Sequence, residues 1–244
     1  MIVIIGETHD DILYFDSVLA NKKEDIILDK YPVSIGTIFS QDVIIVSGLF
    51  TSTLSSAILT HIMDKYFIDL IISVGRCMSV SNGIKNGDVI VSSRVIDANV
   101  DLTMFGDIAI GQIPGFKREF GIQDDIVGYI CKGLNRRISI NYHLAVYLST
   151  NNMSKNMCDA LTQRKEYFSI KNEPMVVDQN SAGVALAAYL QKIPFIVVKV
   201  AENNLSIVNN LESYSDVLSK YIDLGKAVVS TINDISRSDI LEGD

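Results

Sequence analysis

The residue types that most often carry metal or nucleophilic chemistry are sparse in this chain of 244 residues. The chain has three cysteines, none in a CxxC pair, and three widely separated histidines: Cys77, Cys131, Cys158, His9, His61 and His143. Neither set fits a disulfide framework or a metal site. The GxxxxGK[ST], GxGxxG and GxSxG motifs are also missing. We therefore expect no metal ion, no nucleotide cofactor and no serine-hydrolase triad.

A candidate site must then be sought where strands end. In open α/β sheets, ligands bind at the carboxyl ends of the strands. The positions that matter directly follow six expected strands, after Gly6, Ser47, Gly75, Leu148, Val177 and Val200.

Apolar strands and amphipathic helices alternate along the chain. Met1–Gly6 is a continuous apolar run, and Asp69–Gly75 and Phe195–Val200 are mostly apolar, interrupted by Asp69 and Lys199; such runs are typical of strands covered on both faces. Further strands are predicted at Ile26–Asp29, Val33–Phe39, Val43–Ser47, Asp88–Ser92, Arg94–Asp97, Tyr142–Leu148 and Met175–Val177.

Helical spacing of apolar residues predicts six helices, the first with Thr8 as its N-cap. They are Asp10–Ala20, Ser52–Tyr66, Gln123–Leu134, a piece ending near Lys165, Ser181–Gln191 and Leu211–Ile235. The alternation predicts a three-layer α/β/α sandwich with a mixed, mostly parallel central sheet. We expect one domain over residues 1–235 and a polar tail over 236–244.

The segment Asn99–Phe120 has few signs of regular structure but many large apolar residues, among them Phe105, Ile113 and Phe116. It is too apolar for a disordered loop. Because exposed apolar patches usually mark interfaces, we expect it to be buried in a homodimer.

Charge and hydropathy narrow the class of protein. The net charge is −8, without the basic stripe of a nucleic-acid-binding protein. No apolar run reaches the roughly 18–20 residues needed to cross a membrane, and no basic segment precedes the first strand. We expect a cytoplasmic protein with a small-molecule ligand.

Several short motifs, taken in order, resemble the 5'-methylthioadenosine/S-adenosylhomocysteine nucleosidase family of the purine nucleoside phosphorylase superfamily. They are Ile4-Ile5-Gly6, Ser47-Gly48, Lys85-Asn86-Gly87 before Asp88–Val91, Thr103–Gly106 and Gly111–Gly115. The resemblance runs from Met1 to about Ile235, with an insertion between Ser154 and Pro174. It implies a nucleoside-phosphorylase-like fold, a homodimer and cofactor-free hydrolysis of an adenine N-ribosidic bond, which releases adenine and a thioribose product.

The resemblance also implies catalytic positions. Cleavage of such a bond needs a carboxylate to activate water, polar groups to hold the ribose, and an acid to protonate the purine at N7. The corresponding residues are Asp11 for the water-activating Glu, Asn180 for a ribose-facing Glu, and Asn203 for the proton-donating Asp. Because an amide cannot give up a proton at neutral pH, Asn203 predicts weakened or lost activity.

Substrate contacts are implied at seven positions: Gly75, Arg76, Phe105, Asn151, Asn152, Gln179 and Lys199. Arg76 stands where the family has a small hydroxyl residue, and Lys199 replaces an Arg. Asn151 and Asn152 occupy the loop that should present an aromatic ring to the adenine, and Phe105 is implied as a pocket wall.

Three functions remain open at this point. The first is a hydrolase in which Asp10, Asp178 or Glu202 substitutes for a missing acid. The second is an inactive paralogue that binds a nucleoside or an anion, and the third is a phosphorolytic relative.

The charges at these positions suggest what such a pocket would hold. Because Asn180 and Asn203 remove negative charge beside Arg76 and Lys199, we expect a locally positive pocket that favours an anionic ligand. The alternatives are that Arg76 folds onto Asp11 and closes the pocket, that Arg76 and Lys199 form structural salt bridges, and that Asn180 is only a helix N-cap.

Overall fold

The computed structural model describes the backbone of residues 1–137, 140–163, 168, 170, 173–202 and 211–235. The strands are β1 Ile2–Ile5, β2 Ala20–Ile27, β3 Tyr31–Ile38, β4 Gln41–Val46, β5 Leu70–Ser79, β6 Val89–Asp97, β7 Glu119–Gly121, β8 Tyr142–Ser149, β9 Met175–Asp178 and β10 Phe195–Ala201. The helices are α1 His9–Val18, α2 Ser52–Lys65, η1 Thr103–Phe105, α3 Asp124–Asn135, α4 Lys155–Gln163, α5 Ser181–Gln191 and α6 Leu211–Ile235. None of the described helices is long and apolar enough to cross a membrane.

The strands form one mixed sheet, as predicted. Its order is β2-β3-β4-β1-β5-β9-β8-β6-β10, and β7 pairs with β6. Strand β10 also pairs in parallel with β5, so five strands close into a ring. Strand β1 lies parallel to β4 and β5. The parallel pairing brings the carboxyl ends of β1, β5 and β10 to the same edge of the sheet.

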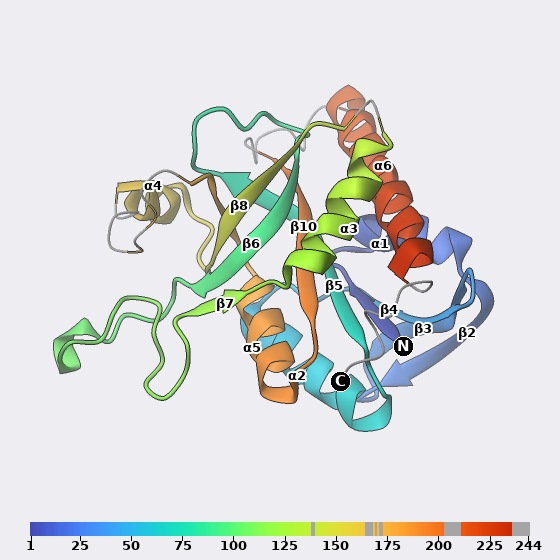
Figure 1. The fold of residues 1–244 in the computed structure, drawn as a ribbon, viewed down its shortest axis with the longest axis horizontal. Coiled ribbons are helices and arrows are strands. Elements are labelled where there is room, and N and C mark those ends of the chain that lie inside the picture. The colour runs from blue at the N-terminus through green and yellow to red at the C-terminus, as the bar shows by residue number, and fades with distance from the viewer. Residues whose placement is uncertain (138–139, 164–167, 169, 171–172, 203–210, 236–244) are drawn as a thin grey trace.

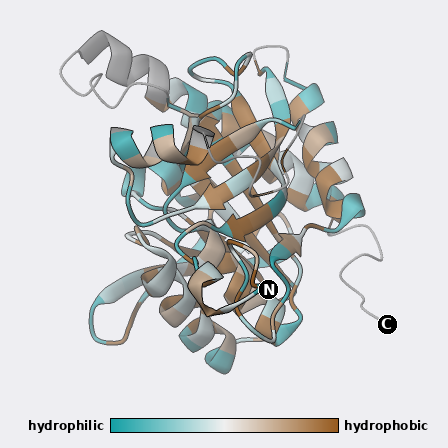
Figure 2. Cartoon of the chain, turned by 90° about the vertical axis from the view of Figure 1, so that its left-hand side faces the viewer, coloured by the Kyte–Doolittle hydropathy of each residue, from teal (hydrophilic) through white to brown (hydrophobic). Residues whose placement is uncertain are grey.

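Side chains of β1 show that helices cover both faces of the sheet. Val3 and Ile5 pack in a core cluster that includes residues of α2 and α5. Ile2 and Ile4 point to the opposite face, where α1, α3 and α6 supply the partners. Figure 1 shows these two helical layers around the strands, and Figure 2 shows the strands as the most hydrophobic part of the molecule. The predicted three-layer sandwich is confirmed.

The insertion between Ser154 and Pro174 contributes to a third core cluster. Leu161, Phe168 and Ile170 are buried there against Val146 of β8 and Met175 of β9. Part of the insertion, and the whole tail 236–244, lie outside the described residues.

The structure differs from the sequence prediction chiefly at β2. This strand begins at Ala20, immediately after α1 ends at Val18, whereas helical spacing predicted a helix to Ala20 and a strand only from Ile26. Strand β2 is an edge strand that exposes its charged side chains, so it lacks the apolar pattern of a buried strand.

Two interior strands are longer than predicted. Asp88–Ser92 and Arg94–Asp97 belong to a single strand, β6, whose register with β8 shifts between Ser92 and Arg94. A bulge of this kind interrupts the apolar alternation without ending the strand. Strand β5 continues past Gly75 to Ser79, because it changes partners and pairs with β9 at Met78 and Ser79.

Candidate active site

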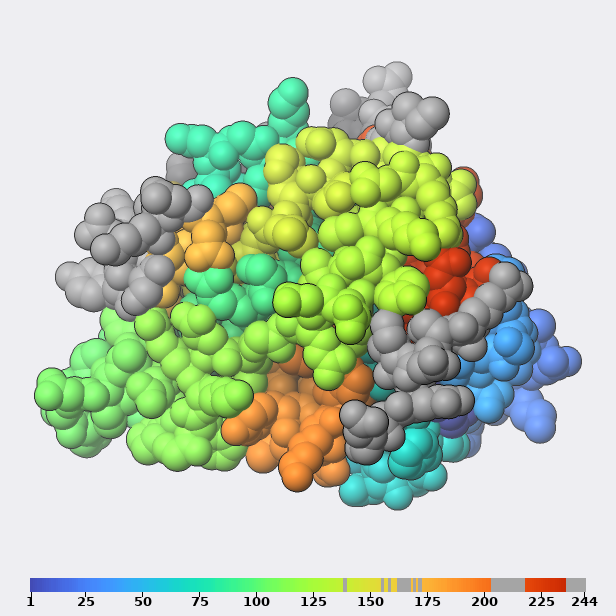
Figure 3. All heavy atoms as spheres, in the orientation of Figure 1, coloured from blue at the N-terminus to red at the C-terminus, as the bar shows by residue number. Residues whose placement is uncertain are grey.

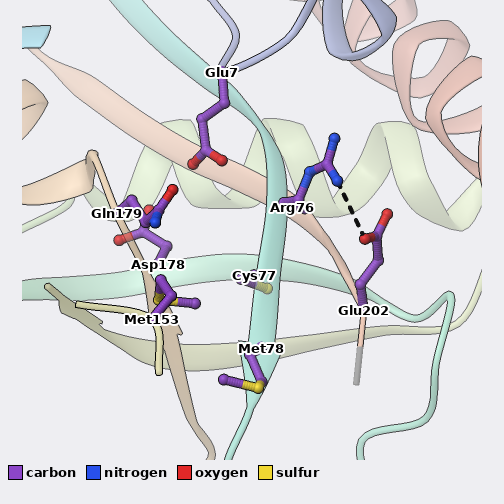
Figure 4. Close-up of a pocket in the computed structure, with 8 residues that line it drawn as sticks. All are labelled: Glu7, Arg76, Cys77, Met78, Met153, Asp178, Gln179 and Glu202. Carbon is purple, nitrogen blue, oxygen red and sulfur yellow. Dashed lines mark ion pairs between the residues drawn. The ribbon is translucent and has the colours of Figure 1, made fainter. Parts of the chain in front are cut away.

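A pocket lies where β1, β5, β9 and β10 end or change partners, as the rule for open sheets predicts. Eight residues line it: Glu7, Arg76, Cys77, Met78, Met153, Asp178, Gln179 and Glu202 (Figure 4). Glu7 follows β1, the next three residues lie on β5, and Asp178 ends β9. Segments far apart in the sequence therefore meet at one place.

Lys199 on β10 is the central cation of the site, and it is fully buried. Its Nζ lies 2.6 Å from Glu7 Oε1, 2.6 Å from Asp178 Oδ2 and 2.7 Å from Asn180 Oδ1. An ammonium group has three N–H donors, so these acceptors use all of them. Lys199 therefore holds three polar side chains in place and has no donor left for a ligand. The alternative that Lys199 is a structural salt bridge is the one that the geometry supports.

The same cluster shifts the pKa values of its members. Burial raises the pKa of Glu7 to about 7, although the neighbouring ammonium of Lys199 opposes this change. Burial disfavours a charge on Lys199, but the carboxylates of Asp178 and Glu7 outweigh that effect and raise its pKa. Lys199 is therefore a permanent cation, whereas the Glu7 carboxyl group changes its charge near neutral pH.

Asp178 rather than Asn180 caps helix α5. Asp178 Oδ1 accepts a hydrogen bond from Ser181 Oγ at 2.6 Å, and Oδ2 accepts one from the Ser181 N–H at 3.3 Å. Asn180 occupies the N-cap position, but its side chain makes no capping hydrogen bond. It donates instead to the carbonyl of Leu49 at 2.9 Å. The alternative that Asn180 is only an N-cap is therefore wrong for its side chain.

Asp11 is buried in the first turn of α1. Its Oδ2 accepts a hydrogen bond from the N–H of Thr8, the residue at the N-cap position, at 2.7 Å. Its Oδ1 is enclosed and has no hydrogen-bond partner among the described residues, and Asp11 lies beside Gly75 without being one of the eight residues that line the pocket. Burial raises the pKa of Asp11, while the hydrogen bond from Thr8 opposes the shift. A base with a free oxygen and a raised pKa suits the activation of water.

Gly75 gives Asp11 its room. Its φ of +143° is one that residues with a side chain rarely adopt, and a Cβ atom there would lie 3.3 Å from Asp11 Oδ2. Gly75 therefore acts through its backbone: it lets β5 pass close beside the carboxyl group.

Arg76 pairs with Glu202, not with Asp11. Its Nη1 lies 3.6 Å from Glu202 Oε2, and the Tyr221 hydroxyl donates to Glu202 Oε1. Figure 4 shows the ion pair on the opposite side of the pocket from Asp178. The alternative that Arg76 folds onto Asp11 and closes the pocket is wrong.

The expected positive charge balance is wrong as well. Three carboxyl groups line the pocket, from Glu7, Asp178 and Glu202, against the single guanidinium of Arg76. The other cation, Lys199, is already matched by Glu7 and Asp178. An anionic ligand therefore gains no excess of positive charge there.

The remaining predicted residues lie at different distances from this pocket. Gln179 lines it. In the loop after β8, Met153 lines it, whereas Asn151 Oδ1 accepts from the Ser52 N–H and Asn152 Oδ1 accepts from the Ser154 N–H. Phe105 lies in η1 with 73% of its surface exposed and does not line the pocket of its own chain. Asn203 lies outside the described residues.

Sequence reasoning missed Glu7. Glu7 directly follows Gly6, the end of an expected strand, and polar residues at such positions are candidates for a ligand site. It was overlooked because the resemblance assigns no role there. Cys77 and Met78, to which the sequence assigned no role in a site, also line the pocket. Burial raises the pKa of Cys77 far above its usual range, so this thiol is not a nucleophile.

The chain is thus an α/β protein with a pocket of ionisable side chains where strands of its central sheet end, and comparison with known proteins identifies its class. Residues 2–232 match the family model of the Phosphorylase superfamily, so the chain belongs to that superfamily.

Relatives within the superfamily specify the family. A protein from Buchnera aphidicola subsp. Acyrthosiphon pisum (strain Tuc7) is 29% identical over 205 residues, which cover 81% of this chain and 85% of that protein. One from Colwellia psychrerythraea is 30% identical over 173 residues, which cover 67% of this chain and 68% of that protein. Both are named 5'-methylthioadenosine/S-adenosylhomocysteine nucleosidase, and the chain belongs to this family.

A solved structure supports the same assignment. A Borrelia burgdorferi B31 chain assigned to this nucleosidase type, crystallised with adenine, has a TM-score of 0.81 and 25% sequence identity. The match covers 96% of this chain and 99% of that one. The predicted family and fold are confirmed.

Proposed function

We propose that the protein hydrolyses the N-ribosidic bond of methylthioadenosine or S-adenosylhomocysteine, releasing adenine and the corresponding thioribose. Its relatives carry the name of this activity, and one related structure is bound to adenine. The observation that carries the proposal is Asp11, a buried carboxyl group with one oxygen free among the described residues, beside the glycine that gives it room.

The geometry of Asp11 fits the role of a general base. The Thr8 N–H fixes one carboxylate oxygen, so the other can take a proton from a water molecule that attacks the anomeric carbon. As the C–N bond breaks, its electron pair goes to the purine and positive charge develops on the sugar. The nearby carboxylates of Asp11 and Glu7 stabilise that charge.

Protonation of the departing adenine is the weak step. Asn203 stands at the position of the acid, and an amide cannot supply a proton. Asp178 and Glu202 do not replace it, since every carboxylate oxygen of both residues already accepts a hydrogen bond or ion pair. Because loss of a general acid typically costs about 10²–10⁴-fold, we expect slow turnover.

Hydrolysis is favoured over phosphorolysis by the state of the two cations. Lys199 has no free N–H group, and Arg76 is paired with Glu202. Lys199 therefore offers no donor to a phosphate group, and the negative charge of Glu202 weakens the attraction of Arg76 for one.

The test is adenine release from methylthioadenosine by the wild-type protein and by Asp11→Asn. We expect the variant to lose roughly 10²–10⁴-fold in rate, because a neutral amide cannot accept the proton from water. Asp16→Asn is the matched control, since Asp16 lies on the same helix and pairs with Lys22 at the surface. An Asp11→Asn variant that keeps the wild-type rate would contradict the proposal.

We also propose that the protein is a homodimer that buries residues 99–120, and that it is cytoplasmic. Met104 and Phe105 in this segment are 87% and 73% exposed in the single chain. The segment forms a lobe that projects from the body of the molecule (Figures 1 and 3). Large apolar side chains on such a lobe are typical of an interface.

A further inference from the structure

We propose that Glu7 is a substrate-binding residue whose Oε2 accepts a hydrogen bond from a ribose hydroxyl group. This inference rests on the proposed function, because it takes the ligand to be an adenine ribonucleoside. It assigns a contact to a residue for which the resemblance implies no role.

A comparison of the carboxylates that line the pocket carries the inference. Both oxygens of Asp178 are engaged, by Ser181 and Lys199. Both oxygens of Glu202 are engaged too, by Tyr221 and Arg76. Glu7 uses Oε1 for Lys199. Among the described residues no group donates a hydrogen bond to Glu7 Oε2. This oxygen is also absent from the buried polar atoms that lack a partner, so it is accessible. One carboxylate oxygen is thus left open to the pocket.

The view of the pocket agrees with this comparison. Figure 4 shows the Glu7 carboxyl group pointing inward between Gln179 on one side and Arg76 on the other. The side chain is only 4% exposed, so any donor that meets it belongs to a molecule held in the pocket.

The position of Glu7 relative to Asp11 indicates that Glu7 contacts the ribose of the ligand rather than its adenine. Both residues come from the segment that follows β1, and their charges are close enough to affect each other. As the general base that activates water, Asp11 must lie close to the anomeric carbon of the ribose. Its neighbour therefore meets the ribose, whose hydroxyl groups are good donors to a carboxylate.

The network around Lys199 explains why Glu7 and not Asn180 takes this role. Asn180 Oδ1 accepts from Lys199, and its amide N–H donates to Leu49. The same ammonium group binds Glu7 Oε1. Lys199 therefore orients the Glu7 carboxylate and leaves one of its oxygens for the ligand.

The experiment measures binding without turnover, in the Asp11→Asn background, by calorimetry. The ligands are methylthioadenosine and its 2'-deoxy and 3'-deoxy analogues. A hydrogen bond to a charged group is worth roughly 10- to 100-fold in affinity, so removing the right hydroxyl should weaken binding by that factor. Adding Glu7→Met, which leaves Lys199 paired with Asp178, should reduce this discrimination to at most about threefold, because it removes the acceptor.

Asp16→Asn is the control, since Asp16 is a carboxylate outside the pocket that pairs with Lys22. It should keep the discrimination between ribose and deoxyribose ligands. If Glu7→Met weakens all three ligands equally, or if Asp16→Asn abolishes the discrimination as well, Glu7 is only a structural partner of Lys199. If Glu7→Met fails to fold, the Asp11→Asn protein alone decides: equal affinity for all three ligands overturns the inference.

Adenine release by the wild-type protein is measured separately. Without release, but with hydroxyl discrimination that depends on Glu7, the proposed hydrolysis fails and the binding role stands. If adenine is released but the discrimination does not depend on Glu7, the proposed hydrolysis stands and the binding role of Glu7 fails.

Discussion

The Nζ atom of Lys199 lies 2.6 Å from Glu7 Oε1, although 192 positions separate the two residues in the chain. The contact joins the segment after β1 to β10, and the same ammonium group also binds Asp178 at the end of β9 and Asn180 two residues later. One buried cation thus ties three segments of the site together. This arrangement makes the stability of the fold depend on residues that also shape the pocket.

Lys199→Met should destabilise the protein by about 3–5 kcal/mol, because it leaves two carboxylates buried without their cation. Urea denaturation measures the loss. Lys22→Met is the control: Lys22 pairs with Asp16 and Glu24 at the surface, and such pairs contribute roughly 0–1 kcal/mol. Equal losses in the two variants would show that the buried cluster contributes no more than a surface pair.

The stability of the protein should depend on pH through Glu7. Burial raises the pKa of Glu7 from 4.5 to about 7, so the folded chain holds this proton more tightly than the unfolded chain. The stabilisation is fully present below pH 4.5 and is lost as the pH rises through about 7.

The measurement is the unfolding free energy of the wild type minus that of Glu7→Gln, followed from pH 5 to pH 8. The difference should fall with rising pH, by a total on the order of 3 kcal/mol over the full titration. Other carboxyl groups occur in both proteins, so their contributions cancel. A difference that stays constant over this range would contradict the assigned pKa.

Asn203→Asp should raise the rate of adenine release at least tenfold, since it restores a group that can protonate the leaving purine. Asn203→Ala is the control and should not raise the rate. Turnover by the wild type near the median enzyme value of about 10 s⁻¹ would show that no acid is missing.

Asn180→Glu, although it restores the carboxylate implied by the resemblance, should lower stability instead of helping. It would place a third carboxylate beside Glu7 and Asp178 and remove the hydrogen bond to Leu49. A melting temperature equal to that of the wild type would contradict this expectation.

Phe105→Asp should weaken the proposed homodimer, because a charge would have to be buried in an apolar interface. Sedimentation at micromolar concentration measures the shift toward monomer. Phe67→Asp is a suitable control, since Phe67 is 84% exposed but lies outside residues 99–120. A wild-type protein that sediments as a clean monomer would rule out the dimer.

The amino-acid sequence alone determined the layers of the fold and the family. Apolar runs such as Ile2–Ile5, and Phe195–Ala201 apart from Lys199, predict strands buried on both faces, and helical spacing predicts the covering helices. Most of the edge strand β2 was not predicted, because an edge strand with exposed, charged side chains has no run of apolar residues.

Only the tertiary structure decided which polar side chains share the site and what each has left to offer. Sequence position put Asp11 and Asn180 in the region of the pocket, but it could not show that Lys199 uses all its donors or that Arg76 pairs with Glu202. It also gave no role to Glu7, because only the contact with Lys199 shows which oxygen of the Glu7 carboxyl group is engaged and which is free. Hydrogen-bond satisfaction depends on contacts between segments distant in the chain, and local patterns in a sequence do not contain them.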